Sequence, residues 1–184
     1  MVLAEVDIVH YTVDALRKGQ VIAYPTDSIW GLGSDVYCLS AYRRILTMKK
    51  RGFDKKLILL VSSWDMLKRY VSIIPAVVLA CPPEEPTTFI YGQTRGLPAW
   101  CLSADGSVAI RVVQRGFAHE MINLLGRPVT STSVNFAGDP PILSGREVAL
   151  LNMPIDYIVP LEVEGTQKPS AIYSVQGEHT TRLR

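Results

Sequence analysis

The apolar run at residues 57–61, Leu-Ile-Leu-Leu-Val, restricts the fold more than any other feature of the sequence. A strand made of five apolar residues has no polar face, so it must be buried on both sides. Strand-like and helix-like segments are mixed along the whole chain, with no linker, repeat or low-complexity segment between them. The 184 residues therefore predict a single domain over residues 1–184, α/β or α+β, with a mixed sheet. The order of the strands does not follow from the sequence.

Hydrophobic periodicity and turn residues predict the individual elements. Helices are expected at 7–18, 40–48, 64–71, 75–80 and 117–125, with a short helix after Ser144. Strands are expected at 21–24, 57–61, 87–91, 107–113, 128–130, 157–159, 171–175 and 181–184, the last two forming a hairpin. Ser40 and Ser63 are candidate N-caps, and Ser144 with Glu147 resembles a capping box.

The composition argues against several classes of protein. A formal net charge of +2 is too small to imply nucleic-acid binding by itself. Three cysteines, far apart and odd in number, fit a reducing compartment and offer no CxxC metal pair. The N-terminus carries early acidic residues, and no apolar run reaches the length of a membrane span. We therefore expect a cytoplasmic protein without a signal peptide or a membrane segment.

The stretch at residues 25–35, Pro-Thr-Asp-Ser-Ile-Trp-Gly-Leu-Gly-Ser-Asp, follows a short apolar strand and precedes a helix. Gly31 and Gly33 would allow positive φ angles or a close approach to a ligand. Thr26 and Ser28 add short polar side chains, and open α/β sheets place ligands at such strand ends. An ordinary strand-to-helix connection explains the same residues. Taken alone, the stretch leaves both interpretations open.

A basic segment at residues 43–56 leaves three interpretations open. It contains seven cations against one acid, Asp54: Arg43, Arg44, Lys49, Lys50, Arg51, Lys55 and Lys56. It could be a solvated helix end, a phosphate clamp for a nucleotide, or a nucleic-acid surface. Its position between a helix and a buried strand places it near one edge of the sheet, which favours a binding role.

Two further features carry polar groups into expected strands. Arg111 lies among apolar residues, and a charge in such a strand is usually paired or held at a ligand, although it could face water from an edge strand. The segment 131–135, Ser-Thr-Ser-Val-Asn, follows a strand and could bind phosphate or a ribose hydroxyl, although the same residues also form plain turns.

The sequence lacks the motifs of several chemistries. It contains neither GxxxxGK[ST] nor GxGxxG, and its three histidines, His10, His119 and His179, are scattered outside the candidate loops. A histidine-based triad or a zinc site is therefore not expected, and we predict no metal-ligating residues. Catalysis would have to come from positioning and charge stabilisation, as it largely does in phosphoryl and nucleotidyl transfer.

Five spaced motifs together resemble the YrdC-like family of threonylcarbamoyl-AMP synthases. Residues 25–35 resemble PTDTxYGLGxD, 49–51 resemble KxR, 107–113 resemble (S/T)xAxRxP, 131–138 resemble STSANxSG, and 169–172 resemble PSTI. Arg184 stands where the family has an arginine in its last strand. The resemblance covers nearly the whole chain, with the motifs in order.

This resemblance implies a fold, a reaction and a set of site residues. The fold would be an α/β twisted open mixed sheet with helices on its faces and a basic concave surface. The reaction would form threonylcarbamoyl-AMP and pyrophosphate from L-threonine, bicarbonate or CO2, and ATP with Mg²⁺. ATP would contact Arg51, Lys55, Ser107, Ser133 and Arg184, with Lys49 and Asn135 supporting the same end. Threonine would contact Ser28, Arg111, Ser131 and Ser170, and Lys49 and Arg51 would stabilise the charge of the transition state.

The resemblance also implies partners and leaves alternatives. The product would pass to tRNA threonylcarbamoyl transferase proteins, and the basic face could bind tRNA or double-stranded RNA. The alternatives are a non-catalytic RNA-binding module and a relative of the same fold that forms another carbamoyl-adenylate. The chain departs from the family pattern at several positions, among them Ser28 for threonine, Trp30 for tyrosine and Val113 for proline. Leu60 and Pro141 replace a histidine and a serine that some members use, and the extra C-terminal domain of longer members is expected to be absent.

Overall fold

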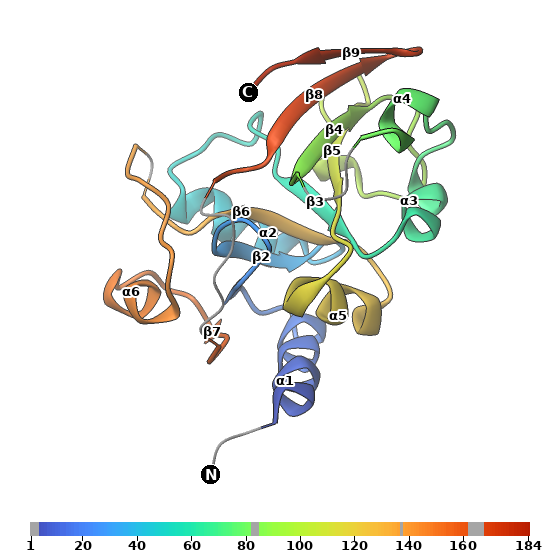
Figure 1. The fold of residues 1–184 in the computed structure, drawn as a ribbon. Helices are drawn as coiled ribbons and strands as arrows, with labels where there is room; N and C mark the ends of the chain where they lie inside the picture. The colour runs from blue at the N-terminus through green and yellow to red at the C-terminus, as the bar shows by residue number, and fades with distance from the viewer. Residues whose placement is uncertain (1–3, 82–84, 137, 162–167) are drawn as a thin grey trace.

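A computed structural model describes residues 4–81, 85–136, 138–161 and 168–184 of the chain. Its described residues contain nine strands that form one open, twisted sheet in the order β7-β1-β2-β6-β3-β5-β4-β8-β9 (Figure 1). The strands are β1 (Ile22–Tyr24), β2 (Gly31–Asp35), β3 (Ile58–Val61), β4 (Thr87–Tyr91), β5 (Val108–Val112), β6 (Val129–Ser133), β7 (Tyr157–Ile158), β8 (Ala171–Gln176) and β9 (His179–Arg182). The predicted open mixed sheet is confirmed.

Parallel and antiparallel pairs alternate irregularly across this sheet. The pairs β1–β7, β3–β5 and β4–β8 are parallel, and the others are antiparallel. The helices are α1 (Glu5–Arg17), α2 (Leu39–Met48), α3 (Trp64–Tyr70), α4 (Ala76–Leu79), α5 (Gly116–Leu125) and α6 (Gly145–Leu150), with a 3₁₀ turn at Ala99–Cys101. Helices α1 and α5 lie side by side, while the β8–β9 hairpin forms the opposite end of the molecule (Figure 1).

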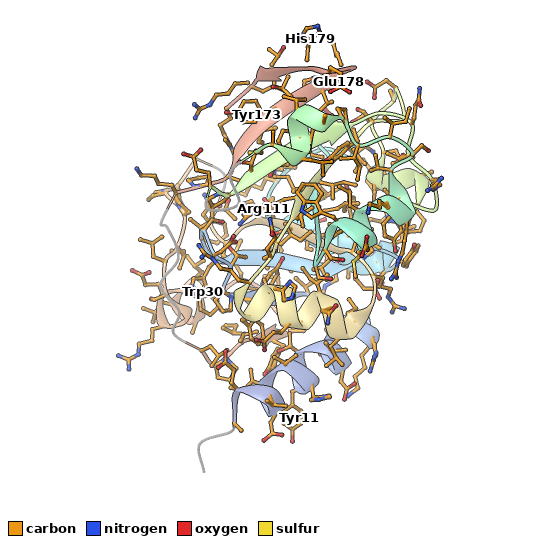
Figure 2. The ribbon with its side chains drawn as sticks, turned by 45° about the vertical axis from the view of Figure 1, so that its right-hand side comes forward. Tyr11, Trp30, Arg111, Tyr173, Glu178 and His179 are labelled. Atoms are coloured by element: carbon orange, nitrogen blue, oxygen red, sulfur yellow. The ribbon has the colours of Figure 1, made fainter. Side chains whose placement is uncertain are left out.

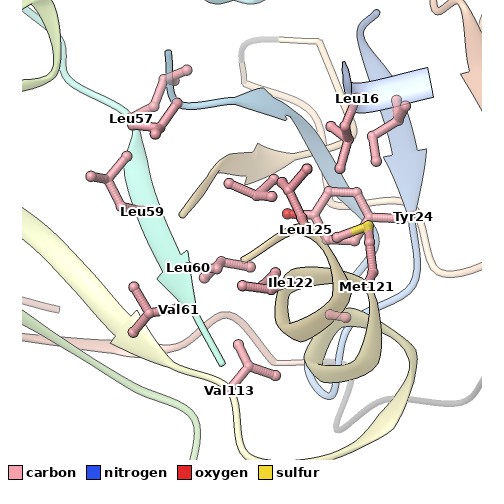
Figure 3. Packing of buried hydrophobic residues seen from close by; sticks show 14 of the residues in the cluster. Leu16, Tyr24, Leu57, Leu59, Leu60, Val61, Val113, Met121, Ile122 and Leu125 are labelled. Atoms are coloured by element: carbon pink, nitrogen blue, oxygen red, sulfur yellow. The ribbon is translucent and has the colours of Figure 1, made fainter. Parts of the chain in front are cut away.

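Strand β3 lies at the centre of the sheet, between β6 and β5, as its apolar sequence predicts. Leu59, Leu60 and Val61 are buried. Figure 3 shows Leu60 on the same side of β3 as Ile122 of α5, while Leu59 and Val61 point to the other side of the strand. Ile58 at the start of β3 is only half-buried. No helix in the described part of the chain has the length and apolar character needed to cross a membrane.

The largest departure from the predicted elements is β2, which occupies residues that were expected to form a polar loop. Gly31 and Gly33 lie inside this strand, and neither adopts the positive φ that glycine would have allowed there. The two glycines are needed for close packing instead. A Cβ built on Gly33 would overlap the Thr130 carbonyl oxygen and lie 2.9 Å from the ring of Tyr24. A strand with no side chains at these positions lets the Tyr24 ring pack directly against β2.

Smaller corrections concern caps and strand ends. The predicted N-cap at Ser40 is wrong, because α2 begins at Leu39 and Cys38 occupies the N-cap position without a side-chain bond. Ser63 caps α3, and Ser144 forms the predicted capping box. Strand β6 continues through Ser133, so the hydroxyls expected in a loop lie on a strand.

Candidate active site

One cavity gathers most of the residues that the sequence singled out. Its volume is about 1060 Å³ when the space open to solvent is included. Its walls come from β2, β3, β5, β6, the turn before β2 and the C-terminal segment. The lining residues are Thr26, Ser28, Ile29, Trp30, Gly31, Arg51, Lys56, Leu57, Ile58, Leu60, Arg111, Ser131, Thr132, Ser133, Asn135, Pro141, Pro169, Ser170, Ile172 and Arg184. Four are cations and none of these described residues is an acid, so the cavity suits an anionic ligand.

Strand register explains why residues distant in sequence share this cavity. Arg111 of β5 lies opposite Leu60 of β3, and Ser131 of β6 lies opposite Ile58 of β3. Ser133 lies opposite Gly31 of β2. Because side chains alternate between the two faces of a sheet, residues two apart on one strand share a face. Ser131 and Ser133 therefore lie on one face of β6.

Arg111 is the buried cation of the cavity and lies near the middle of the molecule (Figure 2). Its Nη1 donates to the hydroxyl of Ser28 at 3.0 Å, and its Nη2 forms an ion pair with Asp27. Its Nε is buried and has no hydrogen-bond partner among the described residues. A buried donor of this kind costs free energy unless a ligand accepts its hydrogen.

The turn before β2 holds Ser28 against Arg111. The Thr26 hydroxyl donates to the carbonyl oxygen of Ile29 at 2.7 Å and accepts the Ser28 backbone N–H at 3.0 Å. Because the only hydroxyl hydrogen of Thr26 goes to Ile29, Ser28 must be the donor in their 3.0 Å hydroxyl pair. A lone pair of the Ser28 oxygen is then free to accept from Arg111. These hydrogen bonds of Thr26 orient Ser28.

Ser170 and Arg184 meet at the C-terminal side of the cavity. The Ser170 hydroxyl is buried and bonds with the Thr88 hydroxyl at 2.8 Å. Arg184 donates from Nη2 to the carbonyl oxygen of Ser170 at 3.0 Å. Partial burial lowers the pKa of Arg184, and the positive charge of Arg51 adds to the shift. Two like charges this close favour an anion between or beside them.

The backbone reverses at the end of α2, which separates the side chains of Lys49 and Arg51. Lys50 has a left-handed backbone with a φ of 49°. The N–H of Arg51 bonds the carbonyl of Leu46 at 3.0 Å, and the N–H of Lys50 bonds that of Thr47 at 3.0 Å. This pair of bonds is a Schellman motif, which reverses the chain after a helix. The reversal places Arg51 on the cavity wall, where Nη1 lies 3.5 Å from the Thr132 hydroxyl.

Lys49 is fully buried and is not among the residues that line the cavity. Its ammonium donates to the carbonyl oxygens of Ser133 at 3.0 Å and Asn135 at 2.5 Å, and to the Asn135 side-chain oxygen. Burial lowers the pKa of Lys49 to about 8, with a contribution from the charge of Arg51. The Asn135 side-chain oxygen also accepts from the Ser133 hydroxyl at 2.7 Å. Lys49 thus holds the end of β6 from beneath.

Two predicted ATP contacts do not reach this cavity. Lys55 is exposed and pairs with Asp54 at 3.6 Å. Ser107 donates its hydroxyl to Asp105 at 2.6 Å and lines no part of the cavity. Sequence reasoning also missed Lys56, which donates to the Trp100 carbonyl oxygen at 3.1 Å and does line the cavity.

Asp27 was also missed as the partner of Arg111. A signal for it exists in the sequence, because a lone arginine in an apolar strand requires a counter-charge. Asp27 is the acid nearest to Ser28 in the same turn.

None of the described residues that line this cavity carries a carboxylate that could bind magnesium. Among the described residues, no group of three or more His, Cys, Asp and Glu side chains is placed to hold a metal ion. The donor set of the cavity, cations and hydroxyls, suits phosphate oxygens and not a hard cation.

Comparison with known proteins identifies the family. The family model for Sua5, YciO and YrdC proteins, described as telomere recombination, matches residues 14–184. The chain is 34% identical over 177 residues to the threonylcarbamoyl-AMP synthase of Vibrio cholerae, covering 92% of this chain and 94% of that protein. It is 31% identical over 172 residues to the threonylcarbamoyl-AMP synthase of Shigella flexneri, with 90% of each chain covered.

Solved structures show the same fold. Sua5 of P. abyssi complexed with L-threonine superposes with a TM-score of 0.83 and 26% identity, over 100% of this chain and 55% of that chain. YciO of E. coli superposes with a TM-score of 0.83 and 25% identity, over 98% and 89%. Because the family model spans nearly all of the sequence and the curated relatives exceed 30% identity, this chain belongs to the Sua5/YciO/YrdC family.

Proposed function

We propose that this protein is an L-threonylcarbamoyladenylate synthase, a nucleotidyltransferase that uses L-threonine, bicarbonate and ATP. One observation carries the proposal. A single cavity combines the buried Arg111, whose Nε–H has no partner among the described residues, with two further arginines, Arg51 and Arg184, of which Arg51 lies close enough to lower the pKa of Arg184. The first suits a small carboxylate and the second pair suits a polyphosphate. The names of the curated relatives support the same activity.

Threonine would bind beside Arg111. Its carboxylate would accept from the Nε–H of Arg111, which has no partner among the described residues. Ser131 and Ser170 line the same cavity and supply hydroxyls for the amine and the side chain of threonine. Leu60 also lines it, so this wall offers an apolar contact where some members have histidine. The L-threonine complex of P. abyssi Sua5 supports the choice of amino acid.

ATP would bind on the Arg51 and Arg184 side. Arg51, Arg184 and Lys56 provide positive charge, and the Thr132 and Ser133 hydroxyls provide donors for phosphate oxygens. Lys49 and Asn135 act through the backbone, because their contacts shape the end of β6. In this proposal Lys49 is a positioning residue, while Arg51 is the catalytic cation. Lys55 and Ser107 would reach ATP only if their present contacts were given up.

The chemistry needs positioning more than acid–base groups. The threonine amine attacks bicarbonate and water leaves, which gives a carbamate. A carbamate oxygen then attacks the α-phosphorus of magnesium-bound ATP, and pyrophosphate leaves. Arg51 would neutralise charge that develops on the phosphates, and an enclosed site would protect the carbamate from loss as CO2. Holding three substrates in one cavity supplies much of the rate by orientation.

Pyrophosphate release tests this proposal. We expect release only when L-threonine, bicarbonate and magnesium-ATP are all present, and mass spectrometry should detect the mixed adenylate. Omitting each substrate in turn, with CO2-free buffer for bicarbonate, provides the controls. Pyrophosphate at background level in the complete mixture, or release that does not depend on threonine, would reject it.

The wider role also belongs to the proposal. The adenylate would serve threonylcarbamoylation of tRNA, through a transferase that accepts it. Cytoplasmic location is proposed as well, supported by three cysteines that are all free thiols. Direct binding of tRNA or double-stranded RNA stays a prediction, which a filter-binding assay over a range of salt concentrations would test.

A further inference from the structure

Arg111 requires a counter-charge even before a substrate arrives. Its side chain is 5% exposed, and its strand neighbours are the apolar residues Ile110 and Val112. An unpaired guanidinium at such a depth would be strongly destabilising. Asp27 meets this need, because its carboxylate pairs with Nη2. The question is whether Asp27 occupies the place of a substrate carboxylate or leaves that place open.

Asp27 reaches Arg111 from outside the basic cavity. It is absent from the residues that line the basic cavity, whereas Arg111 and Ser28 are among them. Asp27 lines a second cavity of about 820 Å³, including open solvent, whose walls include Trp64, Val112 and Arg115. Its side chain is 24% exposed. Water can therefore reach this carboxylate from the second cavity while Arg111 stays enclosed.

Asp27 and Ser28 together hold the two terminal nitrogens of one guanidinium. Asp27 takes Nη2 and Ser28 takes Nη1, from consecutive positions of one turn. Thr26 holds this turn through the Ser28 backbone N–H. The guanidinium is thereby oriented as a plane, and its Nε–H is the donor left without a partner among the described residues.

We propose that Asp27 is a positioning residue, which holds the Arg111 guanidinium against Ser28 from the second cavity so that Nε–H can receive the substrate carboxylate. This inference rests on the proposed function for the identity of the substrate. Asp27 does not touch substrate. It keeps the arginine charged, enclosed and correctly turned when the site is empty, and it stays in place when threonine binds.

A competing role for Asp27 predicts the opposite change in the KM for threonine. If Asp27 were a competitor that substrate must displace, its removal would strengthen threonine binding and lower the KM for threonine. If Asp27 positions Arg111, its removal frees the guanidinium to turn, and the KM for threonine rises. ATP contacts residues on the other side of the cavity, so its KM should change little in either case.

The experiment compares Asp27→Asn with Asp35→Asn. Asp35 is a matched control, because it also pairs with an arginine, Arg127, at 2.5 Å, but it does not line the basic cavity. In pyrophosphate-release assays we expect D27N to raise the KM for L-threonine about tenfold or more, with the KM for ATP within about twofold of wild type. D35N should leave both unchanged even if it lowers the melting temperature. An unchanged or lower KM for threonine in D27N would overturn the proposal.

Crystal structures give a readout that does not require activity. In D27N we expect Arg111 Nη1 to leave the Ser28 hydroxyl, while the 3.0 Å contact persists in wild type and D35N. An Arg111 that keeps this contact in D27N would overturn the proposal even if the wild type proves inactive. Asp27→Glu, which keeps the charge, provides a folded alternative if D27N does not fold, and it should shift Arg111 and raise the KM for threonine less than D27N. Failure of the proposed function would appear separately, as absence of pyrophosphate release in wild type.

Discussion

Gly33→Ala should both destabilise the protein and impair the site, because Gly33 packs against the Tyr24 ring at a position where β2 pairs with β6. The added Cβ would overlap the Thr130 carbonyl oxygen and lie 2.9 Å from Tyr24 Cε1 and 3.2 Å from Val129 Cγ1. The first neighbour is backbone and the Tyr24 ring is fully buried, so neither can move aside cheaply. Strand β6 must shift away from β2 to accept the methyl group.

The overlap sets the size of the expected loss in unfolding free energy. Overpacking a rigid core costs about 1–3 kcal/mol, and a backbone neighbour places Gly33→Ala at the upper end, about 3 kcal/mol. For a chain of this length, each kcal/mol lowers the melting temperature by about 2–4 °C, so we expect a decrease of about 6–12 °C. Gly92→Ala is the matched control, since a Cβ there meets no atom within 4 Å. Its unfolding free energy should change by less than about 1 kcal/mol.

The assay is thermal unfolding by circular dichroism, followed by pyrophosphate release at a temperature where Gly33→Ala remains folded. Ser131 lies directly opposite Gly33 on β6, so displacement of β6 moves a hydroxyl of the cavity wall. We expect activity to fall about tenfold or more in the folded variant. A melting temperature within about 2 °C of wild type would refute the packing argument. Normal activity despite the lower melting temperature would refute the link between strand spacing and the site.

Four further changes test the site and its supports. Arg51→Ala should abolish pyrophosphate release while the circular dichroism spectrum stays native, and full activity would remove the phosphate-clamp assignment. Arg111→Ala should raise the KM for threonine more than the KM for ATP, and the reverse order would reassign it. Lys49→Met should change how the free energy of unfolding depends on pH. Burial lowers the pKa of Lys49 from its ordinary 10.5 to about 8, so between these two pH values the folded state binds fewer protons than the unfolded state. Wild-type stability should therefore rise relative to Lys49→Met by about 3 kcal/mol from pH 8 to pH 10.5, and equal pH profiles in urea unfolding would contradict the shift. Lys50→Gly should stabilise the protein by about 1 kcal/mol, because glycine adopts the left-handed φ of 49° without strain, and a lower urea midpoint would contradict this.

Much of the fold was predictable because local patterns agreed with the tertiary structure. The apolar run that became β3 could only be a strand buried on both faces, and it lies at the centre of the sheet. Ser63 and Ser144 cap helices as predicted, because N-capping depends on a few neighbouring residues. Strand β2 was missed for the opposite reason. Its two glycines have little intrinsic strand preference, and pairing with β1 and β6 on both sides makes it a strand.

The candidate site was predictable in its residue types and less so in its geometry. Arg111 stood out because a lone charge in an apolar strand must have a partner or a ligand, and it has an ion pair. Lys49 and Arg51 looked equivalent in a basic segment. The helix end separates them, one buried beneath β6 and one on the cavity wall. Side-chain direction at a helix terminus depends on the backbone reversal, which composition does not reveal.

The sequence alone determined most of the helices and strands, the central buried strand and the family, because hydrophobic patterns, one apolar run and five ordered motifs carry that information locally. Only the tertiary structure decided which polar groups share a cavity and from which side each acts. Strand order brought β6 between β2 and β3, and register then placed Ser131 opposite Ile58 and Ser133 opposite Gly31. Asp27 and Ser28 are neighbours in the chain, yet Ser28 lines the basic cavity and Asp27 lines the second one. Such directions follow from packing and hydrogen bonds between distant segments, whose free energies a linear pattern does not contain.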